Sequence, residues 1–320
     1  MTLKVVVTDY EYENLEPERE VFEPLGIELI PAQCHTEREV IEAAKDAHGL
    51  ISQYAPITRN VIENLPHCKV ISRYGIGVDT IDVKAASDRG IIVGNVPDYC
   101  IDEVSDHALA LLLTGARKII PLHQAIQKGK WDYKIGVPIY RLRGLVLGLV
   151  GFGRIPQQVA RKAQAFGLRV IAYDPFIPGG VAESFEVKLV QLDELCAQSD
   201  FISVHAPLLA STRGMIGEEQ FRRMKKGAII VNTARGPIIQ EEALIRALQE
   251  RTISGACLDV VEQEPIDESN PLLSMDNVIL TPHISWYSEE SQNELKRKTA
   301  QNVARVLIGE RPDYIVNPIQ

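Results

Sequence analysis

The first third of the chain alternates short apolar runs with segments whose apolar residues recur at helical spacing. Short apolar runs bounded by turn residues predict β-strands, and apolar residues spaced three to four apart predict helices that pack on a sheet. Such an alternation is typical of an α/β domain with a parallel sheet. The predicted strands are 4–8, 27–30, 49–52, 69–72 and 91–94, and the predicted helices are 36–47, 58–65 and 81–89.

A second series of the same kind begins near Arg143. Together the two series predict two Rossmann-like or flavodoxin-like domains with parallel sheets, the second one inserted at residues 99–287 into a discontinuous first domain of residues 1–98 and 288–320. Helix 101–117 is apolar nearly all round in its middle, so we expect it to join the domains and pack against a second subunit. The tail helix 288–307 should return to the first domain. The second series has strands 145–150, 169–173, 187–190, 200–204, 228–232, 254–258 and 277–280.

One segment of the second series carries a specific motif. The apolar run before Gly151-Phe152-Gly153 is followed by a helical pattern and by a strand that ends at Asp174, 21 residues beyond Gly153. Strand, glycines, helix, strand and acid in this order form the dinucleotide-binding fingerprint. The glycines let the backbone approach a pyrophosphate at the helix N-terminus, where Arg154 and Ile155 should offer N–H groups. Asp174 should accept hydrogen bonds from the adenosine ribose.

Asp174 predicts NAD as the cofactor and disfavours NADP. A 2′-phosphate beside this carboxylate would be repelled, by up to about 4 kcal/mol per charge pair at 4 Å, and no Lys or Arg lies between Pro175 and Glu186 to offset the repulsion. Pro156 departs from the fingerprint, which usually has Gly or Ala there. We expect it in the first helical turn, where its missing N–H costs little, with a locally altered turn. A βαβ unit without a ligand is the alternative, but it leaves Asp174 unexplained.

Composition and charge narrow the class of protein. With 320 residues, 45% of them hydrophobic and 24% charged, the chain is long enough for two globular domains. Its net charge of −9 argues against nucleic acid or an anionic membrane as a partner.

No apolar run reaches the length of a membrane span and no signal-like N-terminus is present, so we expect a cytoplasmic protein. The cysteines have no CxxC pair and the histidines no ligand spacing, which predicts reduced core cysteines and no metal site. The cysteines are residues 34, 68, 100, 196 and 257.

Three polar residues follow successive predicted strands of the second domain. Arg235 comes after 228–232, Glu264 after 254–258, and His283 after 277–280. Open α/β sheets bind ligands at the carboxyl ends of their strands, so these side chains should meet at one edge. A guanidinium grips a carboxylate in two places, and a carboxylate beside an imidazole favours the imidazolium, a proton donor. Hydride transfer to a 2-keto acid needs both groups, a cation that binds the substrate carboxylate and an oriented acid/base that handles the hydroxyl proton.

The motifs around these residues resemble the D-isomer-specific 2-hydroxyacid dehydrogenases. They are NTARG at 232–236, LDVVEQEP at 258–265, TPHI at 281–284, RYGIGVDTID at 73–82 and NVPDYCIDEVSDHAL at 95–109. The resemblance covers nearly the whole chain. It implies an NAD-dependent enzyme that interconverts a D-2-hydroxy acid and its 2-keto acid, with an NAD domain inserted into a substrate domain, usually as a homodimer.

The resemblance also assigns roles to residues. It implies His283 as the acid/base with Glu264 as its partner, and Arg235 as the group that binds the substrate carboxylate. It places the cofactor against His205, Ala206, Pro207, Thr233, Ala234 and Asp259, the last holding the nicotinamide amide. It places the substrate against the backbone amides of Gly75, Ile76 and Gly77, and against Arg73 and Trp286.

The residues after His283 separate two branches of the family. A Trp three residues after the His, as Trp286 is here, resembles the C-terminal-binding-protein branch. The Arg at position 73 is shared with phosphoglycerate dehydrogenases. If residues after His283 enter the tail helix, Trp286 would lie about one turn on, wall the pocket and favour 2-keto acids with an apolar or thioether side chain over small or phosphorylated ones. Alternatives are 3-phosphoglycerate as the substrate, or an NAD(H)-sensing dimeric binding protein with little turnover.

Overall fold

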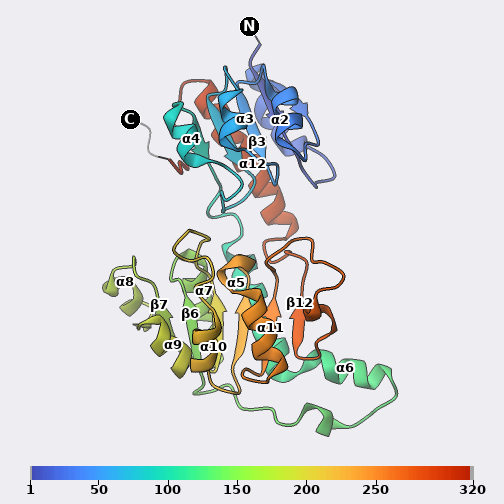
Figure 1. The fold of residues 1–320 in the computed structure, drawn as a ribbon. Helices are drawn as coiled ribbons and strands as arrows, with labels where there is room; N and C mark the ends of the chain where they lie inside the picture. Colours follow the sequence, from blue (N-terminus) through green and yellow to red (C-terminus); the bar gives the residue numbers. More distant parts are fainter. Residues whose placement is uncertain (1, 318–320) are drawn as a thin grey trace. The chain divides into compact units, whose positions relative to one another are not determined.

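The structure is a computed structural model that describes residues 2–317. The chain divides into two compact units, Met1–Cys100 with Ser288–Gln320, and Ile101–Tyr287. Residues 318–320, the end of the predicted discontinuous domain, lie outside the described residues. Each unit has one parallel sheet with helices on both faces (Figure 1). The predicted α/β fold with two parallel sheets is confirmed.

The first unit has a five-stranded sheet in the flavodoxin-like order β2-β1-β3-β4-β5. Its strands are β1 (Lys4–Val7), β2 (Glu28–Pro31), β3 (Gly49–Ser52), β4 (Val70–Arg73) and β5 (Ile92–Gly94). Its helices are α1 (Glu16–Phe22), η1 (Glu23–Leu25), α2 (Glu37–Ala44), α3 (Arg59–Glu63), α4 (Val83–Asp88) and α12 (Glu289–Leu307).

The two faces of this sheet are covered by different parts of the chain. Helices α2, α3 and α4 share one core with alternate residues of the strands. Helix α12 covers the other face, with α1 packed against it. A Cβ on Gly49 would lie 2.8 Å from Val303 of α12, so the glycine permits this close approach of helix and sheet. The C-terminal helix therefore completes the first unit.

The second unit has a seven-stranded sheet in the order β12-β11-β10-β9-β6-β7-β8. The order reverses between β6 and β9, which is the switch point where Rossmann sheets bind nucleotides. Its strands are β6 (Val146–Val150), β7 (Arg169–Tyr173), β8 (Lys188–Leu189), β9 (Phe201–Val204), β10 (Ile229–Asn232), β11 (Gly255–Leu258) and β12 (Val278–Leu280).

Successive residues of these strands enter two separate cores, because side chains alternate across a sheet. One core joins the sheet to α9, α10 and α11, and the other joins it to α5, α7 and α8. The helices and turns are α5 (Ile101–Arg117), α6 (Ile119–Gln127), η2 (Tyr133–Gly136), α7 (Arg154–Ala165), α8 (Gly179–Glu183), α9 (Leu192–Gln198), α10 (Glu218–Arg223), η3 (Gly236–Ile238), α11 (Glu241–Gln249) and η4 (Pro271–Ser274).

Capping side chains explain where several helices begin. Thr36 and Glu39 form a capping box at α2, Asp82 caps α4, and Ser288 caps α12. The predicted strands and helices therefore agree with the structure to within one to three residues at each end. Helices α1, α6, α8, α9, α10 and α11 were not predicted.

The cysteines are core residues, as the sequence predicts. All five are free and buried, so they are small core residues. Among residues 2–317, no helix combines the length and apolar character needed to cross a bilayer.

Candidate active site

The loop after β6 forms the tight turn that the fingerprint predicts. Gly151 has φ of +93°, and a Cβ there would lie 2.9 Å from the backbone nitrogen of Ala206. Only glycine fits this conformation and this close approach without strain. Gly153 is the N-cap of α7, and a Cβ there would meet no atom within 4 Å. The turn thus leaves open space beside the N-terminus of a twelve-residue helix.

Asp174 is anchored to this turn. Its Oδ2 accepts a hydrogen bond of 2.8 Å from the Phe152 N–H, and its Oδ1 accepts bonds from the N–H groups of Phe176 and Ile177. The carboxylate is therefore fixed at the end of β7, next to the glycine turn. Two carboxylate oxygens offer about four acceptor sites, so capacity remains for the predicted ribose hydroxyls.

The first turn of α7 offers the expected donors. The N–H groups of Arg154 and Ile155 donate to no acceptor within residues 2–317, as is usual for the first turn of a helix. Pro156 is the third helical residue, where no backbone N–H is required, and it is buried. Its place in the first turn agrees with the prediction.

The segment after β9 lies beside this turn, because β9 is the neighbour of β6 in the sheet. The His205 N–H donates to the Val150 carbonyl, and His205 Nε2 lies 2.8 Å from the Ser203 hydroxyl. Burial lowers the pKa of His205 to about 3, so this imidazole is neutral at neutral pH. Ala206 is buried against Gly151 and Pro207 is exposed.

The turn after β10 is organised by Asn232, a residue that the sequence analysis did not single out. Its side chain accepts from the Ala234 N–H at 3.0 Å and donates to the Arg235 carbonyl at 2.9 Å. Arg235 Nη1 donates to the Ala234 carbonyl. The buried hydroxyl of Thr233 has no hydrogen-bond partner in the described part of the chain. Such a group points to an absent ligand.

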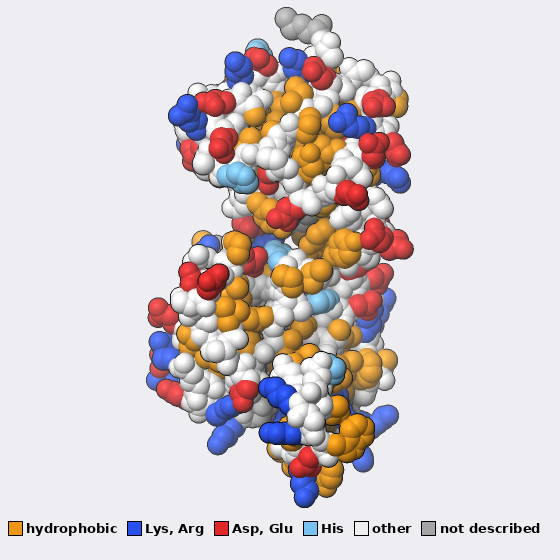
Figure 2. Space-filling view, turned by 90° about the vertical axis from the view of Figure 1, so that its right-hand side faces the viewer, with side chains coloured by type: hydrophobic (Ala, Val, Ile, Leu, Met, Phe, Trp, Pro, Cys, Tyr) orange, Lys and Arg blue, Asp and Glu red, His pale blue; other side chains and the backbone are white. Residues whose placement is uncertain are grey.

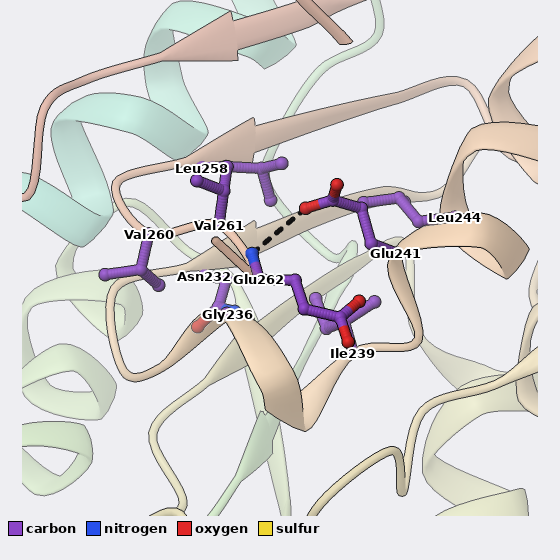
Figure 3. Close-up of a pocket in the computed structure, with 9 residues that line it drawn as sticks. All are labelled: Asn232, Gly236, Ile239, Glu241, Leu244, Leu258, Val260, Val261 and Glu262. Atoms are coloured by element: carbon purple, nitrogen blue, oxygen red, sulfur yellow. Dashed lines mark hydrogen bonds between the residues drawn. The ribbon is translucent and has the colours of Figure 1, made fainter. Parts of the chain in front are cut away.

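Gly236 brings the Arg235 turn against the loop after β11. A Cβ on Gly236 would lie 1.8 Å from the Val261 carbonyl oxygen, so no other residue fits without moving the backbone. The same loop is held from behind by Glu241, whose Oε2 accepts from the Glu262 N–H at 3.0 Å (Figure 3). Figure 3 shows the small pocket between these segments, lined by Asn232, Gly236, Ile239, Glu241, Leu244, Leu258, Val260, Val261 and Glu262.

Asp259 ties the loops after β10, β11 and β12 together. Its backbone N–H donates to the Asn232 carbonyl at 2.9 Å, and its carbonyl accepts from the His283 N–H at 2.8 Å. Its buried side chain accepts from the Thr281 hydroxyl and from the N–H groups of Ile284 and Ser285. The predicted contact of Asp259 with a nicotinamide amide stays a prediction.

His107 of α5 adds to this network. Its Nε2 lies 3.0 Å from the Thr281 hydroxyl and 3.6 Å from Asp259 Oδ1. The sequence alone gives no reason to pair His107 with a loop more than 170 residues away.

Glu264 and His283 form the central pair of the site. His283 Nδ1 lies 2.7 Å from Glu264 Oε2, while Glu264 Oε1 accepts from the Val261 N–H. An ionised carboxylate only accepts hydrogen bonds, so Nδ1 carries the proton. His283 Nε2 has no partner within the described residues, and 26% of the side chain is exposed. The ring is thus oriented by one nitrogen and accessible at the other.

The backbone of His283 is held in an unusual conformation. Its φ of +52° is uncommon for a residue other than glycine and is kept only where neighbours fix it. Here the His283 N–H donates to Asp259, and the His283 carbonyl accepts from the indole Nε1 of Trp286 at 3.0 Å. The strained backbone therefore aims the imidazole.

The condition on which the pocket role of Trp286 was derived, that residues after His283 enter the tail helix, is not met. Residues 284–287 form a turn, closed by a bond from the Tyr287 N–H to the Ile284 carbonyl, and α12 begins at Glu289 after its cap Ser288. The indole packs edge-on against Tyr287 and is half-buried. It still faces back toward His283, through its hydrogen bond and not through helical spacing.

The predicted substrate residues of the first unit follow β4. Gly75 has φ of +134°, and a Cβ there would overlap Arg73 Nη1 at 1.7 Å, so the Arg73 side chain folds over this glycine. The Arg73 guanidinium carbon also lies 5.9 Å from the centre of the Tyr54 ring. Ile76 and Gly77 are half-buried, and their N–H groups have no acceptor among residues 2–317.

The second unit thus brings the predicted cofactor and catalytic residues to the carboxyl edge of one sheet. The open space at Gly153, the first-turn donors of α7 and the unsatisfied Thr233 hydroxyl fit a dinucleotide. In the described part of the chain, no group of three His, Cys, Asp or Glu residues is arranged to hold a metal ion.

Comparison with known proteins agrees with this geometry. Residues 109–285 match the family model "D-isomer specific 2-hydroxyacid dehydrogenase, NAD binding domain". The D-3-phosphoglycerate dehydrogenase of Methanocaldococcus jannaschii is 44% identical over 98% of this chain and 59% of its own length. The glyoxylate reductase of Korarchaeum cryptofilum is 40% identical over 88% of this chain and 86% of its own length.

A solved structure gives the same result. The D-lactate dehydrogenase of Aquifex aeolicus, complexed with NAD and lactic acid, superposes with a TM-score of 0.89, at 29% identity, over 98% of this chain and 99% of that one. The chain spans little more than half of the D-3-phosphoglycerate dehydrogenase named above, and most of the reductase. These relatives favour the phosphoglycerate-dehydrogenase-like branch.

The NAD-binding domain match confirms NAD as the cofactor, and the three relatives named above, two dehydrogenases and one reductase, confirm the predicted enzyme class. The chain belongs to the D-isomer-specific 2-hydroxyacid dehydrogenase family.

Proposed function

We propose that the chain reduces a small 2-keto acid to its D-2-hydroxy acid, and catalyses the reverse reaction, at the carboxyl edge of the seven-stranded sheet. The observation that carries this proposal is the 2.7 Å pair of Glu264 and His283, which leaves His283 Nε2 accessible on the same edge as the glycine turn. An acid/base with one nitrogen fixed by a carboxylate is the arrangement that proton transfer to a carbonyl needs.

NAD has a defined set of partners in this proposal. The N–H groups of Arg154 and Ile155 would bind its pyrophosphate, Asp174 its adenosine ribose, and the Thr233 hydroxyl a further polar group. His205, Ala206, Pro207 and Ala234 would line the remaining surface, as the family resemblance implies, whereas the Asp259 carboxylate holds Thr281, Ile284 and Ser285. When bound, the cofactor supplies or accepts the hydride.

Arg235 and His283 act on the substrate itself. The Arg235 guanidinium would bind the substrate carboxylate and stabilise the charge that develops on the adjoining carbonyl. The His283 imidazolium gives its Nε2 proton to the carbonyl oxygen during reduction, and the neutral ring takes the hydroxyl proton in the reverse direction. Glu264 keeps Nδ1 protonated throughout, so one nitrogen alone exchanges protons with the substrate.

The substrate class is proposed from the relatives and from the first unit. Glyoxylate, the substrate in the name of the K. cryptofilum relative, is the simplest 2-keto acid for this site. The amides of Gly75, Ile76 and Gly77 and the Arg73 guanidinium would bind anionic groups, and Trp286 would wall the pocket. Arg73 and the 44% identity to a D-3-phosphoglycerate dehydrogenase favour 3-phosphoglycerate as a second candidate.

A homodimer is the proposed assembly, with residues 118–143 as its interface in addition to helix α5, which the sequence predicts to pack against a second subunit. Helix α6 and the segment after it extend from the second unit (Figure 1), and hydrophobic and basic side chains are mixed there (Figure 2). Trp131 is 88% exposed and Tyr133 79% exposed. The segment holds six Lys or Arg and one Asp, a net +5, so the rest of the chain carries −9 − 5 = −14. A second copy offers both an apolar counterpart and the acidic surface that suits this segment.

NADH should bind more tightly than NADPH. The 2′-phosphate would be repelled by Asp174, whose position at the glycine turn is fixed by three backbone N–H groups. We expect at least a tenfold difference in Kd in fluorescence titrations, and a smaller difference in Asp174→Asn, which removes the charge. Equal Kd values for the two cofactors in the wild type would contradict this assignment.

Arg235→Ala and His283→Ala should damage different kinetic constants in glyoxylate reduction. Loss of His283 should lower kcat by about 10²–10⁴ with little change in KM, because it removes only the proton donor. Loss of Arg235 should raise KM and lower kcat together, because it binds substrate and transition state. Stopped-flow and steady-state assays with NADH measure both.

Surface variants of the same residue types provide controls for these two. His35→Ala and Arg222→Ala lie on exposed segments and should retain wild-type constants. A near-normal kcat in His283→Ala would eliminate it as the proton donor. Absence of turnover with every 2-keto acid tested, despite tight NADH binding, would favour the NAD(H)-sensing protein.

Trp131→Ser with Tyr133→Ser should convert a dimer to a monomer in light scattering coupled to size exclusion, because the change removes the most exposed aromatic side chains of residues 118–143. Phe176→Ser, which changes an 80% exposed aromatic elsewhere on the same unit, should leave the dimer intact. A monomeric wild type at micromolar concentration, or a double variant that remains dimeric, would refute this interface.

A further inference from the structure

The loop after β4 is fixed from one side by the segment after β5. The Gly75 carbonyl accepts a hydrogen bond of 2.9 Å from the Val96 N–H, and the Ile76 carbonyl accepts one of 2.7 Å from the side-chain amide of Asn95. Two consecutive carbonyl groups of the loop therefore point toward the same two residues.

This arrangement sets the direction of the opposite peptide groups. The N–H and C=O of one planar peptide point in opposite directions, so the N–H groups of Ile76 and Gly77 point away from Asn95 and Val96. Neither N–H has an acceptor within residues 2–317. In a regular strand consecutive N–H groups alternate, whereas here both lie on one side, as in the backbone concavities that bind anions.

Asn95 is itself held in place from behind. Its carbonyl accepts a hydrogen bond of 3.0 Å from the side chain of Asn302, a buried residue of α12. The contacts form a relay from the C-terminal helix through Asn95 to the Ile76 carbonyl. Two hydrogen bonds fix the direction of the loop carbonyl groups. The bond from Val96 is donated by a backbone N–H, so only the bond from the Asn95 side chain depends on the type of residue.

We propose that Asn95 is a positioning residue for substrate binding: by holding the Ile76 carbonyl, it aims the Ile76 and Gly77 N–H groups at the carboxylate of the substrate. This inference rests on the proposed function, which assigns these amides to the substrate. The new element is that the affinity of the enzyme for the substrate carboxylate depends on the Asn95 side chain, which does not contact the substrate.

Removal of Asn95 should weaken the binding of carboxylate ligands selectively. In Asn95→Ala we expect the KM for glyoxylate and the Ki for the inhibitor oxamate to rise by about tenfold each, the factor that corresponds to roughly 1.4 kcal/mol. Asn95→Asp should raise both further, because its carboxylate would repel the Ile76 carbonyl. The Kd for NADH and the kcat at saturating glyoxylate should stay within about twofold.

Asn317→Ala is the matched control. Asn317 is a buried asparagine of the same unit whose amide donates to the Ile91 carbonyl and whose Oδ1 accepts from the Val93 N–H, beside β5 but not on the 75–77 loop. Its loss should lower the thermal midpoint at least as much as Asn95→Ala and leave the KM for glyoxylate unchanged. If Asn95→Ala does not fold, Asn95→Ser serves in its place, since its shorter side chain cannot reach the Ile76 carbonyl.

The outcomes separate this inference from the proposed function. A KM within twofold of wild type in Asn95→Ala, or an equal rise in Asn317→Ala, would overturn the role of Asn95 while leaving the enzyme assignment intact. A wild type that reduces no 2-keto acid would overturn the proposed function, and this inference with it.

Discussion

The site depends on the buried carboxylate of Asp259. Its two oxygens hold the Thr281 hydroxyl and the backbone of Ile284 and Ser285, and its own backbone bonds to Asn232 and His283. These hydrogen bonds connect the loops that follow β10, β11 and β12, just as the sheet connects the strands themselves. Loss of a partner in so buried a network leaves unsatisfied polar groups, at about 1–3 kcal/mol each, so the network stabilises the three loops in one arrangement.

The chemistry follows from this fixed frame. The His283 backbone is kept at positive φ, which places Nδ1 on Glu264 and leaves Nε2 accessible. Gly236 lets the turn that carries Arg235 approach the loop after β11, which carries Glu264. The nucleotide turn at Gly151 uses the neighbouring strands of the same sheet, so cofactor and acid/base share one rigid support. In the first unit, the relay through Asn95 fixes a peptide loop in a comparable way.

Much of this could be predicted from the sequence, because the signals are local. Apolar runs marked the strands, and the order of glycines, helix and Asp174 marked the cofactor turn. The parallel order then placed Arg235, Glu264 and His283 on one edge. Contacts between distant residues could not be predicted: nothing local pairs His107 with Thr281 or Asn95 with Ile76. The pocket role of Trp286 was derived on the condition that residues after His283 enter the tail helix, but the cap at Ser288 starts that helix later.

The most direct test of this account is Asp259→Asn, which keeps the size of the side chain and replaces one acceptor by a donor. Hydride transfer to saturating glyoxylate should slow by about 10²-fold in single-turnover stopped flow, the scale expected for a small displacement of catalytic groups. The Kd for NADH should change by less than about threefold, because Asp259 acts through the His283 loop. A Kd raised tenfold or more, with a wild-type rate at saturating NADH, would contradict the account and make Asp259 a ligand of the nicotinamide.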